Sequence, residues 1–127
     1  MTGSEARDPF KRIAAMMNMQ LYAILTRPSQ EGVDLRPVLN DHLDYMVELE
    51  KDGRVFASGP FSGEDGRPTG HGLTIVRGAS LKEAAEIAER DPFVQAGLRA
   101  FDIQKWTVNE GQVWLGVTFS DRGGQTR

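Results

Sequence analysis

His42 is the residue of this chain best suited to chemistry. It lies within an apolar pattern in which Leu39, Leu43 and Met46 recur at helical spacing. A helix over these residues would turn the imidazole toward a sheet and away from water. Imidazole has the ordinary pKa nearest neutrality, so a pocket histidine can accept and return a proton. The alternative is a half-buried histidine bonded to a backbone carbonyl.

Asp91 is the second candidate. It precedes Pro92 and Phe93, a pattern typical of a helix N-cap with proline in the first turn, and that role needs no active site. The same carboxylate can accept a hydrogen bond from one imidazole nitrogen, fix the tautomer and leave the other nitrogen as a base. A carboxylate offers several acceptor sites, so both roles are compatible. We therefore predict His42 and Asp91 as a catalytic pair, provided that the fold brings them together.

The remaining polar residues give weaker signals. His71 lies between glycines in an expected exposed connection, where it is a solvated loop residue unless a pocket lies nearby. Asp41 and Asp44 point away from His42 in different directions on a helix, so we expect no metal site. No glycine-rich turn joins a strand to a helix, and we expect no cofactor. The candidates for lining a substrate pocket, with core packing as the alternative for the aromatic ones, are Tyr22, Tyr45, Ser58, His71 and Phe93.

Size and composition limit the possible functions. A chain of 127 residues forms one domain with its own core. A net charge of −3 with interspersed signs provides no basic surface for nucleic acid. The chain has no cysteine, which excludes disulfides and a thiol nucleophile. No apolar stretch reaches membrane-spanning length, so we expect a cytoplasmic protein that acts on a small molecule without a membrane partner.

Four strands and two helices are expected to position these residues. Asp34 is the expected N-cap of the first helix and Asp52-Gly53 its end, while Ser80 and Glu83 form a capping box for the second. The expected order is a strand over residues 19–26, a helix over 35–51, strands over 54–59 and 73–77, a helix over 81–90, and a strand over 100–108. An exposed connection over residues 59–72 separates the second strand from the third.

The two ends of the chain extend beyond this pattern. Residues 1–18 are expected to form an extension with a short helix, residues 19–108 the globular domain, and residues 109–127 a C-terminal strand and a polar tail. Asn109-Glu110-Gly111 predicts a hairpin loop that leads to a fifth strand over residues 112–120.

The element order predicts an α+β fold of the ferredoxin-like βαββαβ type with an extra C-terminal strand. Right-handed crossovers place both helices on one face of an antiparallel sheet. The other face is left apolar and without cover, so a homodimer with sheet packed on sheet is expected.

An ordered set of short motifs in this chain resembles the YCII-like family, part of the dimeric α/β barrel group. The likeness covers residues 19–107. Its matching segments are Leu21-Tyr22-Ala23-Ile24, His42-Leu43, Gly53-Arg54-Val55 leading to Ser58-Gly59-Pro60, the strand after Gly72, Asp91-Pro92-Phe93 with Gly97-Leu98, and Lys105-Trp106.

The resemblance implies a ferredoxin-like fold that dimerises through its sheets, with a histidine–aspartate pair in a cleft. Those roles would belong to His42 and Asp91. It also implies that one branch removes chloride from a chlorinated hydroxyhydroquinone and that related barrels isomerise lactones or act on polyketides. Relatives often carry an arginine one helical turn before the histidine, where this chain has Val38 and Leu39. Arg36 is too far back to replace it directly.

These observations lead to one preferred hypothesis and two alternatives. The preferred hypothesis is a cofactor-free lyase or isomerase for a small cyclic or aromatic hydroxylated compound, with His42 as general base and Asp91 as its orienting partner. The first alternative is a non-catalytic, dimeric small-molecule binding module. The second is purely structural, with His42 in the core and Asp91 as a helix cap.

Overall fold

The computed structural model describes residues 7–120 and 125–126. The chain divides into two compact units. One unit spans residues 20–107, and the other combines the segments on either side of it, up to Met19 and from Val108 onward.

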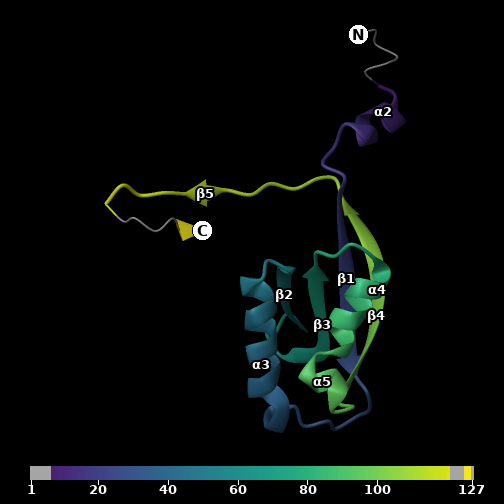
Figure 1. Ribbon diagram of the computed structural model, residues 1–127, viewed down its shortest axis with the longest axis vertical. Coiled ribbons are helices and arrows are strands. Elements are labelled where there is room, and N and C mark those ends of the chain that lie inside the picture. Colours follow the sequence, from purple (N-terminus) through teal and green to yellow (C-terminus); the bar gives the residue numbers. More distant parts are fainter. Residues whose placement is uncertain (1–6, 121–124, 127) are drawn as a thin grey trace. The chain divides into compact units, whose positions relative to one another are not determined.

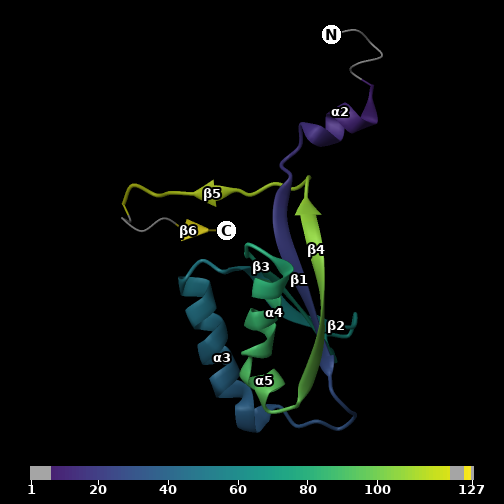
Figure 2. The ribbon, with the colours of Figure 1, turned by 45° about the vertical axis from the view of Figure 1, so that its right-hand side comes forward.

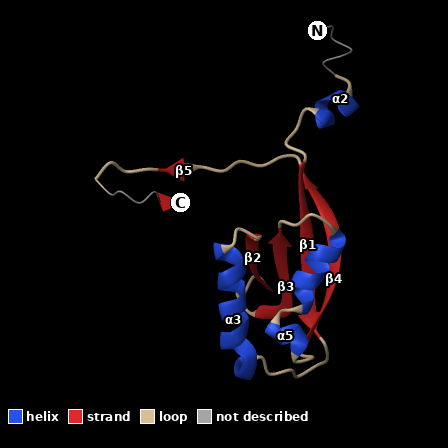
Figure 3. Cartoon of the chain, viewed as in Figure 1, coloured by secondary structure: helices blue, strands red, loops and turns tan. Residues whose placement is uncertain are grey.

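The larger unit is a four-stranded antiparallel sheet with helices (Figure 1). The elements follow the predicted βαββαβ order, with a short helix added before the last strand, and the strands lie in the order β2-β3-β1-β4 (Figure 3). This arrangement confirms the predicted ferredoxin-like α+β fold. The elements are β1 (Met19–Pro28), α3 (Arg36–Lys51), β2 (Val55–Ser62), β3 (Pro68–Val76), α4 (Leu81–Glu89), α5 (Pro92–Gln95) and β4 (Arg99–Val108).

The core lies between the sheet and the helices, which cover one face of it (Figure 2). Alternate residues of a strand face the same side, which is why Tyr22 and Ile24 of β1 both point at the helices. Burying a side chain of this size stabilises a fold by about 1.5–3 kcal/mol. The core residues are Tyr22, Ile24, Leu49, Val76, Ala84, Ile87 and Ala88.

Local signals set the helix boundaries. The Ser80 side chain accepts a hydrogen bond from the Glu83 backbone N–H, which confirms the predicted start of α4. The predicted cap of α3 was one residue early: Leu35 occupies the N-cap position, and Asp34 accepts from the Arg36 backbone N–H and pairs with its guanidinium. Gly53 after α3 adopts a left-handed φ of 75°, which favours glycine at a helix end.

The connection predicted over residues 59–72 is largely exposed, as expected, but most of it is strand and not loop. β2 continues to Ser62 and β3 begins at Pro68, so only residues 63–67 form the turn. Proline and glycine normally argue against strand, but β2 is an edge strand, where Pro60 need not donate to a second neighbour. Pro68 is tolerated because it is the first residue of β3.

The second unit holds a short helix and two short strands. α2 (Pro9–Ala14) lies in the N-terminal segment and is capped by Asp8, whose carboxylate accepts from the Phe10 N–H. β5 (Leu115–Gly116) pairs with β6 (Gln125–Thr126).

The predicted fifth strand over residues 112–120 is therefore much shorter than expected. It pairs with β6, whereas the predicted hairpin at Asn109–Gly111 would have paired it with the preceding strand. The strand was predicted from the turn signal that precedes it, yet Val113 and Trp114 are each 73% exposed. Without burial of that apolar surface, little stabilises a longer strand.

Candidate active site

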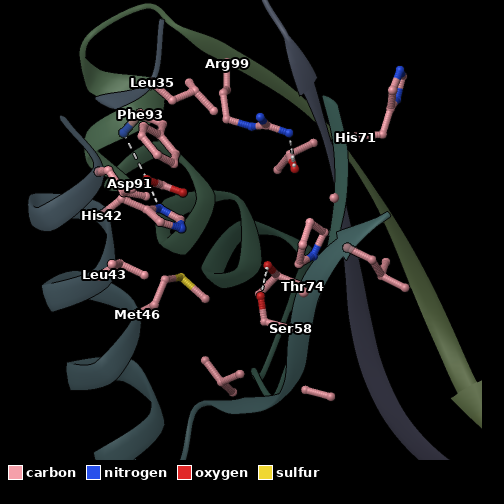
Figure 4. Close-up of a pocket in the computed structure, with 18 of the residues that line it drawn as sticks. Leu35, His42, Leu43, Met46, Ser58, His71, Thr74, Asp91, Phe93 and Arg99 are labelled. Atoms are coloured by element: carbon pink, nitrogen blue, oxygen red, sulfur yellow. Dashed lines mark hydrogen bonds and ion pairs between the residues drawn. The ribbon is translucent and has the colours of Figure 1, made fainter. Parts of the chain in front are cut away.

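His42 and Asp91 meet although 49 residues separate them along the chain. His42 Nδ1 lies 2.8 Å from Asp91 Oδ1 (Figure 4). The two side chains are 22% and 12% exposed, so solvent reaches the pair without surrounding it. His42 comes from the middle of α3 and Asp91 from the junction of α4 and α5.

Local structure orients the Asp91 carboxylate. Asp91 caps α5, and its Oδ1 accepts the Phe93 backbone N–H at 2.9 Å, as the Asp-Pro pattern predicted. The same oxygen bonds to His42. The oxygen that caps α5 is therefore also the oxygen that contacts His42. The sequence suggested a helix cap and a histidine partner as two roles for Asp91, and the structure shows both contacts.

The imidazole is held on a second side by an aromatic ring. Phe93 stacks on His42 with ring centroids 4.2 Å apart and planes 18° from parallel. When the neutral imidazole carries its proton on Nδ1, this N–H donates a hydrogen bond to the carboxylate and Nε2 keeps its lone pair. Figure 4 shows the ring edge with this second nitrogen turned toward the pocket.

A cavity of about 590 Å³ opens beside the pair. This volume lies within the range of small-molecule sites. One wall is apolar and comes from α3 and β2, with Leu39, Leu43 and Phe56 among its residues. On the sheet side, the hydroxyls of Ser58 and Thr74 are hydrogen-bonded to each other at 2.7 Å.

The apolar stripe of α3 does not pack as expected. The sequence predicted that Leu35, Leu39, Leu43 and Met46 face the core, but Leu39 and Leu43 are 40% and 48% exposed and border the cavity. Only the C-terminal half of α3 touches the core, through Leu49 with Tyr45 and Met46 packed against the cluster. The stripe is a pocket wall, which helical periodicity alone does not distinguish from a core face.

Arg99 is a cavity residue that the sequence interpretation missed. It is the first residue of β4, and one guanidinium nitrogen, Nη2, donates to Gly70 O at 2.7 Å and Thr26 Oγ1 at 3.1 Å. Burial lowers the pKa of Arg99 below its usual value, while the negative charge of Asp91 acts in the opposite direction. The sequence did contain a signal for this position. Phe101 and Ile103 pack against the core, and because alternate residues of a strand share a face, Arg99 lies on the same helix-covered side.

Of the five residues expected to line a substrate pocket, Ser58 and Phe93 border the cavity near His42. His71 is at its rim, but its side chain is exposed and points away from the pocket in Figure 4, because odd-numbered residues of β3 face the opposite side of the sheet.

The two tyrosines do not border this cavity. Tyr22 is buried in the core, because it lies on the helix-covered face of β1 directly opposite Val76. Tyr45 donates to Ile87 O at 2.7 Å. Burial, together with the charge of Asp91, raises the pKa of Tyr45 above its ordinary value.

Among the described residues, no group of three or more histidine or acidic side chains is placed to hold a metal ion. In the same part of the chain, no helix has the length and apolar character needed to cross a bilayer.

Comparisons with known proteins add a family and a fold. The family model described as YCII-related domain matches residues 20–107. The uncharacterized protein YjpA of Bacillus subtilis (strain 168) is 32% identical over 69 residues, which is 54% of this chain and 75% of YjpA.

A solved structure with a similar fold is the 5-chloro-2-hydroxyhydroquinone dehydrochlorinase TftG from Burkholderia phenoliruptrix AC1100, in complex with 2,5-dihydroxybenzoquinone. Its TM-score is 0.50 at 23% identity, and the match covers 67% of this chain and 92% of the TftG chain. At this identity the likeness shows the fold alone.

Proposed function

The chain belongs to the YCII-related domain family, as its sequence motifs implied, and from that premise we propose that it is a cofactor-free lyase or isomerase. The substrate is a small cyclic or aromatic hydroxylated compound bound in the cavity. One observation carries this proposal: an imidazole bonded to a carboxylate borders a cavity large enough for such a compound.

His42 acts as the general base in this proposal. Nε2 takes a proton from the substrate, and Asp91 then stabilises the imidazolium through its bond to Nδ1. In a dehydrohalogenation the electron pair left by the proton forms a new double bond in the ring as the halide leaves with the electrons of its bond to carbon, and His42 later releases the proton to solvent. In an isomerisation His42 returns the proton to a different atom. A positioned base of this kind contributes about a hundred- to ten-thousand-fold in rate.

The neighbour with the similar fold supports the choice of substrate class. TftG is a dehydrochlorinase of a chlorinated hydroxyhydroquinone and was solved with a quinone. The apolar wall formed by Leu39, Leu43 and Phe56, beside the hydroxyls of Ser58 and Thr74, suits a ring with polar substituents.

Turnover of chlorinated hydroquinols and lactones by wild type, His42→Ala and Asp91→Asn tests this function. We expect both variants to lose most of the activity on any compound that the wild type converts, His42→Ala by about a hundredfold or more. Asp44→Asn, a carboxylate change on the exposed side of α3, is the matched control and should keep wild-type turnover. Unchanged turnover in His42→Ala would show that His42 is not the general base.

The apolar character of the cavity wall favours one other function, a non-catalytic binding module for small molecules. A ligand would then raise the melting temperature without being converted, and His42→Ala would bind it as the wild type does. The hydroquinol panel, read by both thermal shift and turnover, separates the two functions.

We further propose that the protein is a homodimer that packs sheet against sheet. Leu25 lies opposite Leu73 on neighbouring strands, and both point away from the helices because Ile24 and Thr74 face them. Trp106 of β4 shares that side by the same alternation and is 44% exposed. These three residues define the distal sheet face. Apolar surface of this kind is stabilised by a second copy related by two-fold symmetry.

A further inference from the structure

We propose that Arg99 is the residue that binds an anionic oxygen of the substrate, so that the cavity selects ring compounds carrying a carboxylate or a similar oxyanion. This inference rests on the proposed function and deepens it by naming a charge on the substrate.

The guanidinium of Arg99 is only partly used by the protein. Nη2 donates to the Thr26 hydroxyl and the Gly70 carbonyl, which are both neutral acceptors. Nε and Nη1 of Arg99 have no hydrogen-bond acceptor among the described residues. An arginine presents its donors as a planar fork that matches a carboxylate, so donors remain for a ligand.

The charge of Arg99 has no ion-pair partner among the described residues. The arginines that do form ion pairs are Arg27, Arg36, Arg54 and Arg67. Of the two acids that border the cavity, Glu50 and Asp91, neither forms an ion pair with Arg99, and Asp91 is already hydrogen-bonded to His42 and to the Phe93 N–H. A partly buried cation is unfavourable without a counter-charge, and an anionic ligand would supply one.

No other cation reaches this cavity from the described part of the chain. Arg99 is the one lysine or arginine that borders it, and α3 contributes apolar residues, His42 and Glu50. Arg36, at the start of α3, is paired with Asp34 on the surface. The position that selects an anion is therefore on β4, while the base is on α3.

Two glycines on β3 lie beside the groups that accept hydrogen bonds from Arg99. Gly70, whose carbonyl accepts from Arg99, has a left-handed φ of 88°. A Cβ on Gly72 would lie 2.8 Å from Thr26 Oγ1 and 3.8 Å from Arg99 Nη2. A larger residue at position 72 would displace the hydroxyl that holds Arg99, so the strand is shaped around this side chain.

The arrangement orients a ligand. Figure 4 shows Arg99 extended across one end of the pocket toward the strands, with His42 and Asp91 on the helix side. An oxyanion held by the free donors of Arg99 would place the rest of the ring along the wall of Leu39 and Leu43 and within the space that His42 borders.

Equilibrium binding of benzoate and of its neutral counterpart benzamide, measured by calorimetry or NMR titration on the full chain, tests the inference. We expect the wild type to bind benzoate about tenfold more tightly than benzamide, because charge-assisted hydrogen bonds are roughly twice as strong as neutral ones. Arg99→Met should remove this preference and leave benzamide binding within about twofold. Arg67→Met, the matched control, removes an exposed arginine that is paired with Asp65 outside the cavity, and it should keep the preference.

Equal affinity of the wild type for the two probes would overturn the inference, whatever the variants do. A preference retained in Arg99→Met would also overturn it. If Arg99→Met fails to fold, Arg99→Lys decides the matter: it keeps the charge without the planar fork, and we expect a reduced preference for benzoate. An undiminished preference in Arg99→Lys would contradict a role for the fork.

The same experiment distinguishes this inference from the proposed function. His42→Gln should keep the preference for benzoate, because the imidazole is not the anion-binding group. A preference without turnover of any hydroquinol or lactone would contradict the enzymatic function and support Arg99. Turnover by a wild type that binds benzoate and benzamide equally would support the enzymatic function and contradict the role of Arg99.

Discussion

At the scale of single residues, Asp91 combines two tasks in one oxygen atom. Its Oδ1 caps α5 through the Phe93 N–H and also bonds to His42 Nδ1. A local structural requirement therefore orients the carboxylate before any ligand binds. A carboxylate held in this way fixes the tautomer and the ring plane of His42, and the fold sets both without a ligand.

Replacing Asp91 separates these tasks. Asp91→Ala should lower the free energy of unfolding by about 1–2 kcal/mol, because the N-cap and the bond to His42 are both lost. Asp91→Asn should lose less than about half of that, because an amide oxygen still accepts the Phe93 N–H. Urea denaturation followed by circular dichroism measures both. Equal losses in the two variants would mean that the cap contributes nothing.

At the scale of elements, the site depends on how α3 is joined to α4. The Tyr45 hydroxyl on α3 donates to the carbonyl of Ile87 on α4, close to the helix end that leads to Asp91. Leu49 adds an apolar contact farther along α3. The N-terminal half of α3 stands over the cavity, so these few contacts keep His42 at bonding distance from Asp91.

Removing the Tyr45 hydroxyl tests this link. Tyr45→Phe should lower the free energy of unfolding by about 1 kcal/mol, because the hydrogen bond is lost and the Ile87 carbonyl no longer has this donor. Matched melts of the Phe variant and wild type at neutral pH measure it. A stability equal to that of the wild type would show that the hydroxyl does not join the helices.

The pH dependence of stability gives an independent check of the same contact. The pKa of Tyr45 is raised in the folded state, so the neutral phenol is the favoured form. The stability that the neutral phenol contributes is fully present below the ordinary tyrosine pKa of about 10. It is lost as the pH rises through the higher folded-state pKa. Wild type should therefore lose stability above about pH 10 more steeply than Tyr45→Phe, whereas parallel curves would contradict the assignment.

At the scale of the whole molecule, the sheet of the larger unit has one face under helices and one distal face with Leu25, Leu73 and Trp106. A ferredoxin-like unit with such a face is well suited to pairing with itself. The cavity lies on the helix-covered side, so a partner packed on the distal face would leave the entrance to His42 unobstructed.

A charge placed on the distal sheet face tests the proposed dimer. Leu25→Lys should shift the protein from dimer to monomer in analytical ultracentrifugation, because an unpaired buried charge is strongly unfavourable at an apolar interface. Leu81→Lys is the matched control: Leu81 is exposed on α4, on the other side of the sheet, and the change should leave the dimer intact. A monomeric wild type would refute the proposal directly.

Much of the fold could be predicted from the sequence because the signals are local. The Ser80 cap, the glycine after α3 and the short apolar run of β1 each depend on neighbouring residues, and each element they predict occurs in the structure. The errors came where burial overrides local pattern. The Pro60 segment became an edge strand, and the apolar residues around Trp114 were not buried enough to extend a strand.

The sequence by itself determined the candidates, a histidine on a helix and an Asp-Pro cap, and the family motifs suggested that they meet. Only the tertiary structure decided that His42 and Asp91 are 2.8 Å apart, that Leu39 and Leu43 form a pocket wall, and that Arg99 shares the cavity. The physical reason is that caps and periodicity are set within a few residues, whereas these contacts depend on the order of strands in the sheet. That order brings the start of β4 to the end of β1 and the start of β3, which are segments far apart along the chain.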